Sequence, residues 1–251
     1  MEKYFNELNL IKKTVRSIWT TTDFKKDIMI KDGDDIVTTT DLKVETTLIE
    51  MIKENFPTDL ILSEETNNHR QLKGRTWIID PVDGTSNYAA DFGVYCTQIA
   101  LFDQDDIVLS YIYVPDFKKE YYAIKRCGAY LNNQPIKTNQ NEILSNALIS
   151  FVGSFRREKT GSNLPVDLIK KSVDHNMKVR VLGSAGVELA LLAEGIFSGI
   201  YTPITNIYDV APGLLLIREA GAYIEGFNEK TYKLAQTPLF AWSNKQLANK
   251  F

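Results

Sequence analysis

The segment Asp80-Pro81-Val82-Asp83-Gly84-Thr85 places two carboxylates three positions apart where the chain turns sharply. It follows the apolar run 77–79, so we expect it at the end of a buried strand. Two carboxylates held close together there would repel each other and lose water. Mg²⁺, which prefers carboxylate, carbonyl and water oxygens, would remove that conflict. Gly84 allows close approach of a ligand, and a helix beginning near Thr85 would offer free N–H groups to phosphate. The segment therefore predicts a site for a metal ion and a phosphate group.

Further acidic residues are expected at the ends of other buried segments. Glu64 and Glu65 follow the apolar run 60–62, while Asp41 and Asp209 each lie beside a predicted helix start. Taken singly, the two aspartates are explained as helix N-caps and the glutamates as a solvated loop. Together they favour one site, because α/β structures build their sites at the ends of strands and helices.

Length and composition restrict the class of protein. The 251 residues suffice for one large domain or two intimate halves, and 44% hydrophobic with 24% charged residues is typical of a soluble globular chain. A net charge of −3 gives no general attraction to nucleic acid or anionic membranes. No apolar stretch is long enough to span a bilayer, and residues 1–7 lack the apolar core of a secretory signal.

The few cysteines and histidines argue against other chemistries. Cys96 and Cys127 form no disulfide framework, so a reducing cytoplasm fits best. His69 and His175 are the two histidines, both in polar stretches that we interpret as solvated surface. The chain therefore has few residues that could bind zinc or form a Ser-His-Asp triad. If the protein is an enzyme, carboxylates and a metal ion must do the work.

Hydrophobic periodicity predicts a layered α/β chain. We expect helices over residues 4–19, 41–54, 165–173, 187–194 and 210–219. Strands are predicted at 60–62, 77–79, 96–102, 107–114, 121–124, 148–151, 179–182, 197–201 and 223–224, with turns at 31–35 and 126–129. The strands before residue 140 look antiparallel, whereas helices and strands alternate after it. Residues 1–251 thus read as one compact domain with a soft boundary near residue 140.

Several motifs carry a resemblance to one family. The string 77–88 resembles the first signature of the inositol monophosphatase family, and 208–213 followed by 219–221 is similar to the second. Supporting matches are Val37 to Asp41, Ser63-Glu64-Glu65, 128–132 and Gly183-Ser184-Ala185. They occur in the family's order and spacing over nearly the whole chain, so the chain is identified as a member.

The resemblance implies a five-layer α-β-α-β-α sandwich of the inositol monophosphatase and fructose-1,6-bisphosphatase type. It also implies a homodimer that hydrolyses small phosphate monoesters with Mg²⁺ and is inhibited by Li⁺. Residues 1–140 would form a metal-binding α+β half and residues 141–251 an α/β half. Such a protein uses two metal ions, with a weaker third, to neutralise phosphate, activate water and stabilise the leaving alkoxide.

The resemblance also implies a role for each matching residue. Glu64, Asp80 and the Val82 carbonyl would bind the first metal; Asp80, Asp83 and Asp209 the second; Glu64 would assist the third. Gly84 and Thr85 would donate N–H groups to phosphate, while Asp41 and the Thr85 hydroxyl would orient and deprotonate water. Gly183, Ser184, Ala185, Asp83 and Thr202 would contact the alcohol part of the substrate.

The chain departs from the family pattern on the substrate side. Thr202 stands where relatives acting on inositol monophosphate carry a Glu, and losing that acceptor should weaken polyol recognition by about 1.5–3 kcal/mol. Tyr208 replaces a Trp, and Pro212 replaces an Ala at what we expect to be a helix's first turn. Inositol monophosphate is therefore not implied as the substrate.

Two alternatives stay open. A relative acting on 3′-phosphoadenosine 5′-phosphate or fructose 1,6-bisphosphate would need basic residues, which Arg156, Arg157 and Lys159 could supply, although a charge run is more often a solvated face. The string 84–88 resembles the monophosphatase type more closely, with histidinol phosphate and sugar phosphates also open. A non-catalytic metal or phosphate sensor is disfavoured, because Asp41 and Thr85 are retained along with all the metal ligands.

Overall fold

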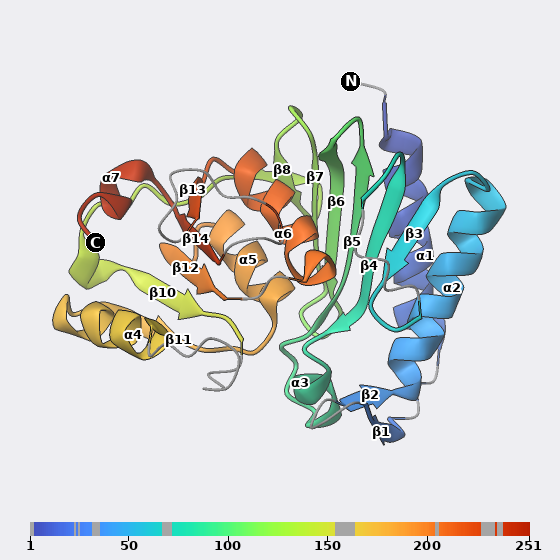
Figure 1. The fold of residues 1–251 in the computed structure, drawn as a ribbon, viewed down its shortest axis with the longest axis horizontal. Coiled ribbons are helices and arrows are strands. Elements are labelled where there is room, and N and C mark those ends of the chain that lie inside the picture. The colour runs from blue at the N-terminus through green and yellow to red at the C-terminus, as the bar shows by residue number, and fades with distance from the viewer. Residues whose placement is uncertain are drawn as a thin grey trace.

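The computed structural model describes residues 3–22, 24, 26–31, 36–66, 72–153, 164–203, 206–226, 234 and 238–251. Most of the turn expected at 31–35, His69, and the basic run Arg156, Arg157 and Lys159 lie outside these residues. Two sheets and the helices between and around them build the molecule (Figure 1).

The larger sheet has seven strands in the order β3-β4-β5-β6-β7-β8-β9. Their bounds are β3 Leu60–Ser63, β4 Thr76–Asp83, β5 Cys96–Asp103, β6 Asp106–Val114, β7 Lys119–Ile124, β8 Ala129–Leu131 and β9 Gln134–Ile136. Only the β3–β4 pair is parallel; the other five pairs are antiparallel. The prediction of antiparallel strands in the first part of the chain is confirmed, except at the edge strand β3.

The smaller sheet has five strands in the order β11-β10-β12-β14-β13. Their bounds are β10 Leu148–Phe151, β11 Lys178–Arg180, β12 Gly199–Thr202, β13 Tyr223–Gly226 and β14 Leu239–Trp242. Strands β11, β10 and β12 run parallel, β14 pairs antiparallel with β12, and β13 pairs antiparallel with β14. Sequence reasoning found four of these strands and missed β14, which lies beyond the last predicted element.

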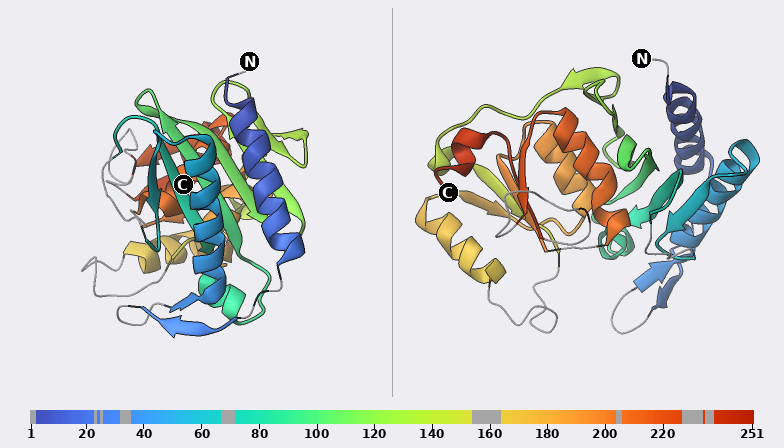
Figure 2. Two further views of the ribbon diagram at one scale, coloured as in Figure 1. Left: turned by 90° about the vertical axis from the view of Figure 1, so that its right-hand side faces the viewer. Right: turned by 45° about the horizontal axis from the view of Figure 1, so that its top comes forward.

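Helices cover both sheets and separate them. They are α1 Phe5–Thr21, α2 Thr39–Asn55, α3 Thr85–Ala89, α4 Leu164–Asp174, α5 Ala185–Ala193, α6 Ile207–Glu219 and α7 Lys245–Ala248, with a short 3₁₀ turn at Leu144–Asn146. Helices α1 and α2 lie side by side on the outer face of the large sheet (Figure 2). The pair α5–α6 lies between the sheets, and α4 and α7 cover the outer face of the small one (Figure 1).

Side-chain alternation along the strands explains the five layers. On β4, Trp77 and Ile79 point into the core shared with α1 and α2, whereas Ile78 points into the core shared with α5 and α6. On β12, Ile200 joins that central core and Tyr201 joins the outer core with α4 and α7. Each sheet is thus apolar on both faces, and only a helical layer on either side can bury it. The expected α-β-α-β-α fold is confirmed. The domain boundary near residue 140 remains a prediction, because the central core belongs to both halves.

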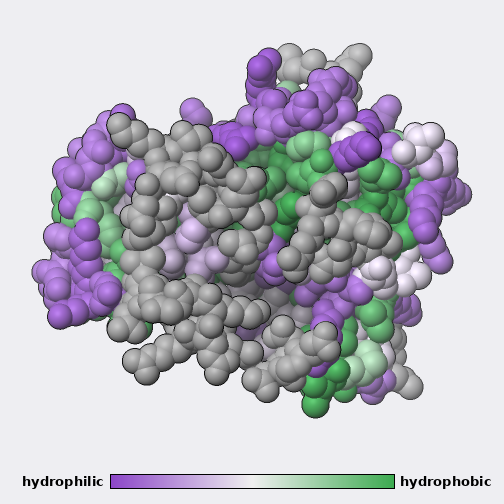
Figure 3. Space-filling view, viewed as in Figure 1, coloured by the Kyte–Doolittle hydropathy of each residue, from purple (hydrophilic) through white to green (hydrophobic). Residues whose placement is uncertain are grey.

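A small hairpin stands apart from the layers. Strands β1 Ile28–Ile30 and β2 Ile36–Thr38 pair with each other and leave Ile28, Met29 and Ile30 exposed. The space-filling view shows apolar surface at the end of the molecule where β1 and β2 lie (Figure 3). Among the described residues, no helix is both long and apolar enough to cross a bilayer.

Two helix starts differ from the expectation. Helix α2 begins at Thr39 with Thr38 as N-cap, so Asp41 is the third helical residue of a capping box. Helix α6 begins at Ile207, which places Asp209 in its first turn and Pro212 inside the helix. The expectation that Pro212 lies in the first turn is therefore wrong, because the helix starts three residues earlier than the apolar pattern suggested. Both aspartates keep their side chains near a helix N-terminus, where negative charge is stabilised.

Candidate active site

A β-bulge at the end of β4 brings two carboxylates to one face of the sheet. Asp80 pairs with Gln98 and Asp83 with Cys96, so three steps along β4 match two steps along β5. In a regular strand, residues three apart point to opposite faces; the extra residue cancels that alternation. Pro81 lies within this irregular stretch, where a missing N–H is tolerated, and its carbonyl accepts a hydrogen bond from Thr97 Oγ1 at 2.7 Å.

Asp80 lies at the centre of the site and is fully buried. Its Oδ2 accepts a hydrogen bond from Gln98 Nε2 at 3.1 Å, and the same nitrogen lies 3.3 Å from the main-chain oxygen of Asp209. Within the described residues, Asp80 Oδ1, Gln98 Oε1 and Ser63 Oγ are buried without a hydrogen-bond partner. Burial, and then repulsion by Glu64, Asp83 and Asp209, raise the pKa of Asp80 well above its usual range.

Glu64 and Asp209 face Asp80 from two other elements. Glu64 follows β3, whose pairing sets Ser63 opposite Ile79 and so brings Glu64 next to Asp80. Burial raises the pKa of Glu64, opposed by Lys31, whose Nζ lies 3.3 Å from Glu64 Oε1. Burial, followed by repulsion from Asp83 and Glu64, raises the pKa of Asp209 well above its usual range. Three separate chain segments therefore deliver carboxylates to one buried region.

The glutamate pair is not a solvated loop. Glu65 exposes 3% of its side chain, and its carboxylate is ion-paired with Lys31. Its backbone N–H donates to the buried Glu45 of α2 at 2.9 Å. Burial raises the pKa of Glu65 to about 7. Helix α2 thus fixes the segment that carries Glu64, and the solvated-loop interpretation is wrong.

Asp83 points to the start of α5. Its Oδ2 accepts hydrogen bonds from Ser184 Oγ at 2.5 Å and from the Gly186 N–H at 2.7 Å, and its Oδ1 accepts from the Ala185 N–H at 3.2 Å. Burial raises the pKa of Asp83, and these donors oppose the rise. The second carboxylate of the signature therefore links β4 to the segment expected to contact the alcohol part of a substrate.

Asp41 and Thr85 form a hydrogen-bonded pair beside the carboxylates. Asp41 Oδ2 is anchored by the Thr38 N–H at 2.9 Å and by the Thr38 hydroxyl, which leaves Oδ1 to face Thr85 Oγ1 at 3.0 Å. Thr85 Oγ1 also lies 2.9 Å from the Val82 main-chain oxygen. Burial raises the pKa of Asp41, partly offset by the Thr38 donors. The capping box of α2 thus orients one oxygen of Asp41 toward the end of β4.

The turn before α5 packs directly on this segment. Gly84 has φ +89°, and a Cβ there would lie 3.1 Å from Ser184 Cβ and 3.3 Å from the Gly183 main-chain oxygen. Only glycine meets both demands. Gly183, Ser184 and Ala185 are therefore adjacent to the signature, as expected. Thr202, by contrast, ends β12 fully buried, and its side chain is closed to a substrate in this structure.

A family model, described as the inositol monophosphatase family, matches residues 6–251. The chain belongs to the inositol monophosphatase family. An inositol monophosphatase of Dictyostelium discoideum is 32% identical over 203 residues, which is 79% of this chain and 75% of the relative. A fructose-1,6-bisphosphatase/inositol-1-monophosphatase of Aquifex aeolicus is 30% identical over 197 residues, covering 78% and 74%. The fold matches that of the extragenic suppressor protein suhB of Bartonella henselae with a TM-score of 0.85 at 22% identity, over 98% of this chain and 96% of that one.

As a member of the inositol monophosphatase family, the protein is a phosphoric monoester hydrolase. The carboxylates are close together but not arranged as a finished metal cage. In the part of the chain that the structure describes, no three acidic, histidine or cysteine side chains are placed to ligate one ion. Lys31 pairs with Glu64, and α5 holds both oxygens of Asp83.

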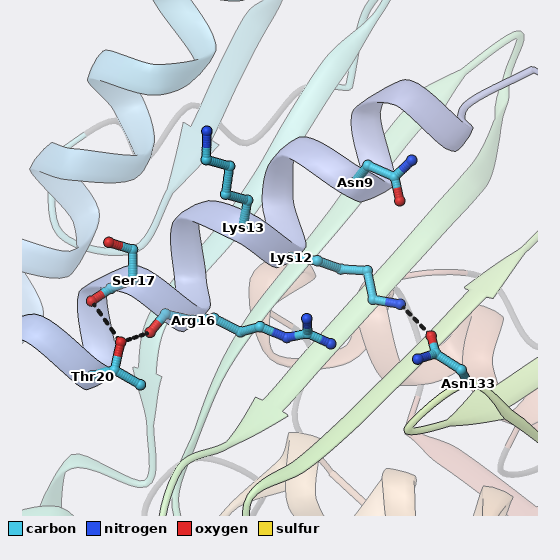
Figure 4. Close-up of a pocket in the computed structure, with 7 residues that line it drawn as sticks. All are labelled: Asn9, Lys12, Lys13, Arg16, Ser17, Thr20 and Asn133. Carbon is cyan, nitrogen blue, oxygen red and sulfur yellow. Dashed lines mark hydrogen bonds between the residues drawn. The ribbon is translucent and has the colours of Figure 1, made fainter.

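A groove of about 630 Å³ lies elsewhere, along α1. Its lining residues are Asn9, Lys12, Lys13, Arg16, Ser17, Thr20 and Asn133 (Figure 4). Lys12 and Arg16 contact the buried carboxylate of Glu120 at 3.0 and 2.7 Å, and Lys12 Nζ also donates to Asn133. Two of the three cations are thus already engaged. The groove belongs to the outer helical layer, away from the carboxylates of the family's signatures.

Sequence reasoning missed three residues of the site. Lys31 begins the predicted turn 31–35, and nothing in the neighbouring sequence indicates that its side chain reaches Glu64. Gln98 lies in an apolar strand, where a lone amide is a modest signal. Glu188 interrupts the apolar run of α5 and is fully buried, a signal that was available in the sequence.

Proposed function

We propose that the protein hydrolyses a small polyol or sugar phosphate with the help of Mg²⁺ bound by Glu64, Asp80, the Val82 carbonyl, Asp83 and Asp209. The observation that carries the proposal is the meeting of carboxylates from β3, β4 and α6 around the buried Asp80. Gln98 Nε2 touches both Asp80 Oδ2 and the backbone of Asp209, so these segments are in direct contact.

The donor set fits Mg²⁺ in chemistry. All the donors are hard oxygens, and Asp80 Oδ1 is a buried acceptor without a hydrogen-bond partner among the described residues. A buried carboxylate that repels three others is costly unless a cation compensates it. When bound, Mg²⁺ neutralises the phosphate, lowers the pKa of a bound water and stabilises the leaving alkoxide. Two ions, with a weaker third at Glu64, are what family membership suggests.

The chain's own groups would handle the water and the phosphate. Asp41 would hold the Thr85 hydroxyl, and the pair would orient the attacking water and take up its proton; the 3.0 Å hydrogen bond between them supports this role. The N–H groups of Gly84 and Thr85 would bind phosphate oxygens. Helix α3 has only five residues, so these two donors matter more than any helix dipole.

The substrate proposal is a small phosphorylated alcohol rather than inositol monophosphate in particular. Gly183, Ser184 and Ala185 would contact the alcohol, while the buried Thr202 offers no carboxylate to its hydroxyls. Asp83, already hydrogen-bonded to this turn, would share in that contact. The name of the Aquifex relative makes fructose 1,6-bisphosphate the second compound to test. A homodimer is proposed on family membership alone, and a cytoplasmic location on the small number of cysteines.

A phosphate-release assay tests the proposal. We expect p-nitrophenyl phosphate to be hydrolysed with Mg²⁺ and not after EDTA, with activity restored by excess Mg²⁺. Millimolar Li⁺ should lower the Mg²⁺-supported rate, as family membership suggests. Inositol phosphates, hexose phosphates, fructose 1,6-bisphosphate, histidinol phosphate and 3′-phosphoadenosine 5′-phosphate then rank the substrates. Metal-independent release, or none with any of these compounds, would refute the proposal.

A further inference from the structure

Glu188 is a fully buried carboxylate that accepts hydrogen bonds from the approach to α5 and from β10. Its Oε1 accepts from the N–H of Gly183 at 2.9 Å and from the N–H of Leu182 at 3.1 Å. Its Oε2 accepts from the Ser150 hydroxyl of β10. The rest of α5 is almost wholly apolar, so nothing in the packing of that helix requires a charge here.

The same turn is also held by α3, the helix that lies within the first signature. Asn87 of α3 donates from Nδ2 to the Leu182 carbonyl at 2.8 Å and to the Val94 carbonyl at 2.8 Å. Glu188 therefore holds the N–H groups of the turn, and Asn87 holds a carbonyl. Because Gly183 has φ +81°, its backbone has wide conformational freedom and depends on such bonds to keep one conformation.

Burying a carboxylate costs free energy, because the charge loses its hydration. An apolar side chain of similar size would avoid its desolvation cost. Hydrogen bonds from two backbone N–H groups to a carboxylate are short and directional, so they define the conformation of a turn better than apolar packing does. The cost is understandable if the position of the turn matters to the reaction.

We propose that Glu188 is a positioning residue that fixes the turn 182–185 and thereby sets how tightly the alcohol part of the substrate is bound. This inference rests on the proposed function, since the contact between that turn and the alcohol is part of it. Glu188 touches no substrate itself; it acts through the backbone of Leu182 and Gly183.

Kinetics with two substrates test the inference. At an assay pH of about 8, where the carboxyl group is mostly ionised, Glu188→Gln removes the charge and one acceptor while keeping the shape. We expect it to raise the KM for glycerol 2-phosphate about tenfold, the effect of losing a charge-assisted hydrogen bond. The KM for p-nitrophenyl phosphate, which has no alcohol hydroxyls, and the kcat for both substrates should stay within about twofold. A matched control is Glu219→Gln, because Glu219 accepts the N–H groups of Arg126 and Gly128 at 2.8 and 2.9 Å away from the site.

An equal loss with both substrates, or no change with either, would overturn the inference. If Glu188→Gln does not fold, Ser150→Ala removes one of the three donors to Glu188, and we expect a smaller KM increase confined to glycerol 2-phosphate. Ser150→Ala effects that are equal on both substrates, or absent, would overturn it as well.

Hydrogen exchange separates this inference from the proposed function. In Glu188→Gln, or in Ser150→Ala to a smaller extent, the amides of Leu182 and Gly183 should exchange about tenfold faster, while those of α6 keep their rates. If wild type hydrolyses no phosphate ester, the proposed function fails but the exchange data still decide whether Glu188 holds the turn. Unchanged exchange at Leu182 and Gly183 would refute the positioning role even in an active enzyme.

Discussion

The end of β4 and the turn before α5 lie against each other but are stabilised in different ways. Strand β4 has eight residues, hydrogen-bonded neighbours on both sides and apolar layers on both faces. The turn follows β11, a three-residue edge strand that is mostly exposed, and it keeps its shape through the side chains of Glu188 and Asn87. The acidic residues around Asp80 are therefore placed by the core, whereas the conformation of the turn depends on a few hydrogen bonds.

This difference has a consequence for how such a protein can change. Replacing a residue at the end of β4 affects a bulge that the whole sheet supports, so variants there should lose chemistry while keeping the fold. Replacing a residue around the turn changes a local conformation, so substrate preference should shift while turnover survives. The departures from the family pattern, at Thr202, Tyr208 and Pro212, lie in β12 and α6, outside both regions, and they spare the acidic residues.

The largest expected effect comes from the β4 side. Asp80→Asn should lower kcat/KM by more than about 10³-fold, because the shared metal ligand is lost and metal stabilisation is worth several kcal/mol. Without metal at neutral pH, thermal unfolding should show the variant at least as stable as wild type, since an uncompensated buried charge has gone. Wild-type turnover at saturating Mg²⁺ would contradict the assignment of Asp80.

The second prediction concerns the water-orienting pair. Thr85→Ala should lower kcat about 10²–10⁴-fold, the range for losing general base assistance, and change the Mg²⁺ concentration for half-maximal rate much less. Thr47→Ala is the matched control, because the exposed Thr47 hydroxyl donates to the Lys43 carbonyl within α2. A large increase in the Mg²⁺ requirement with kcat retained would place Thr85 in metal binding instead.

Most of the features at the end of β4 could be predicted from the sequence, and few of those around the turn before α5 could. The acidic pair of the signature is local, and the apolar runs place Asp80 and Asp209 beside buried segments, so the convergence of Asp80, Asp83 and Asp209 was predictable. The β-bulge that makes it possible was not, because a register shift depends on the neighbouring strand. Layer order followed from apolar runs that bury both faces of each sheet.

Contacts between distant segments could not be predicted. Nothing in the sequence indicates that Lys31 pairs with Glu64, or that the Glu65 N–H donates to Glu45 of α2, because such contacts depend on the tertiary fold. Helix starts were misplaced by two or three residues at α2 and α6, since capping residues and not apolar spacing decide where a helix begins. The hydrogen bonds of Glu188 and Asn87 to the turn 182–185 could not be predicted for the same reason, although the lone acidic residue in the apolar run of α5 was a signal in the sequence.

A third prediction uses pH to probe the turn side. Burial raises the pKa of Glu188 from 4.5 to about 7, against the hydrogen bonds from Ser150, Gly183 and Leu182. The folded state thus holds this proton more tightly than the unfolded state. The resulting stability is fully present below about pH 4.5 and is lost as pH rises through about 7.

Glu188→Gln cannot titrate, so the comparison isolates this group from the other acidic residues, Asp83 included. The unfolding free energy of wild type minus that of the variant should fall by about 3 kcal/mol between pH 4.5 and 8. This follows from a pKa of Glu188 that rises from 4.5 in the unfolded chain to about 7 in the folded protein. Denaturant unfolding of both proteins in EDTA at a series of pH values measures this. A difference that stays flat across the range would show that Glu188 does not bind a proton there.

The smallest effect is expected from the backbone of the turn. Gly183→Ala introduces a Cβ at φ +81°, 3.4 Å from Asn87 Nδ2, and the left-handed conformation costs a non-glycine residue roughly 1–2 kcal/mol. The turn should relax, raising the KM for glycerol 2-phosphate about fivefold with kcat retained. Gly74→Ala is the matched control, since Gly74 has φ +63° with nothing within 4 Å of its Cβ position. Both variants should lose similar stability, but only Gly183→Ala should raise the KM for glycerol 2-phosphate. If Gly183→Ala and Gly74→Ala have the same KM for that substrate, the turn does not shape alcohol binding.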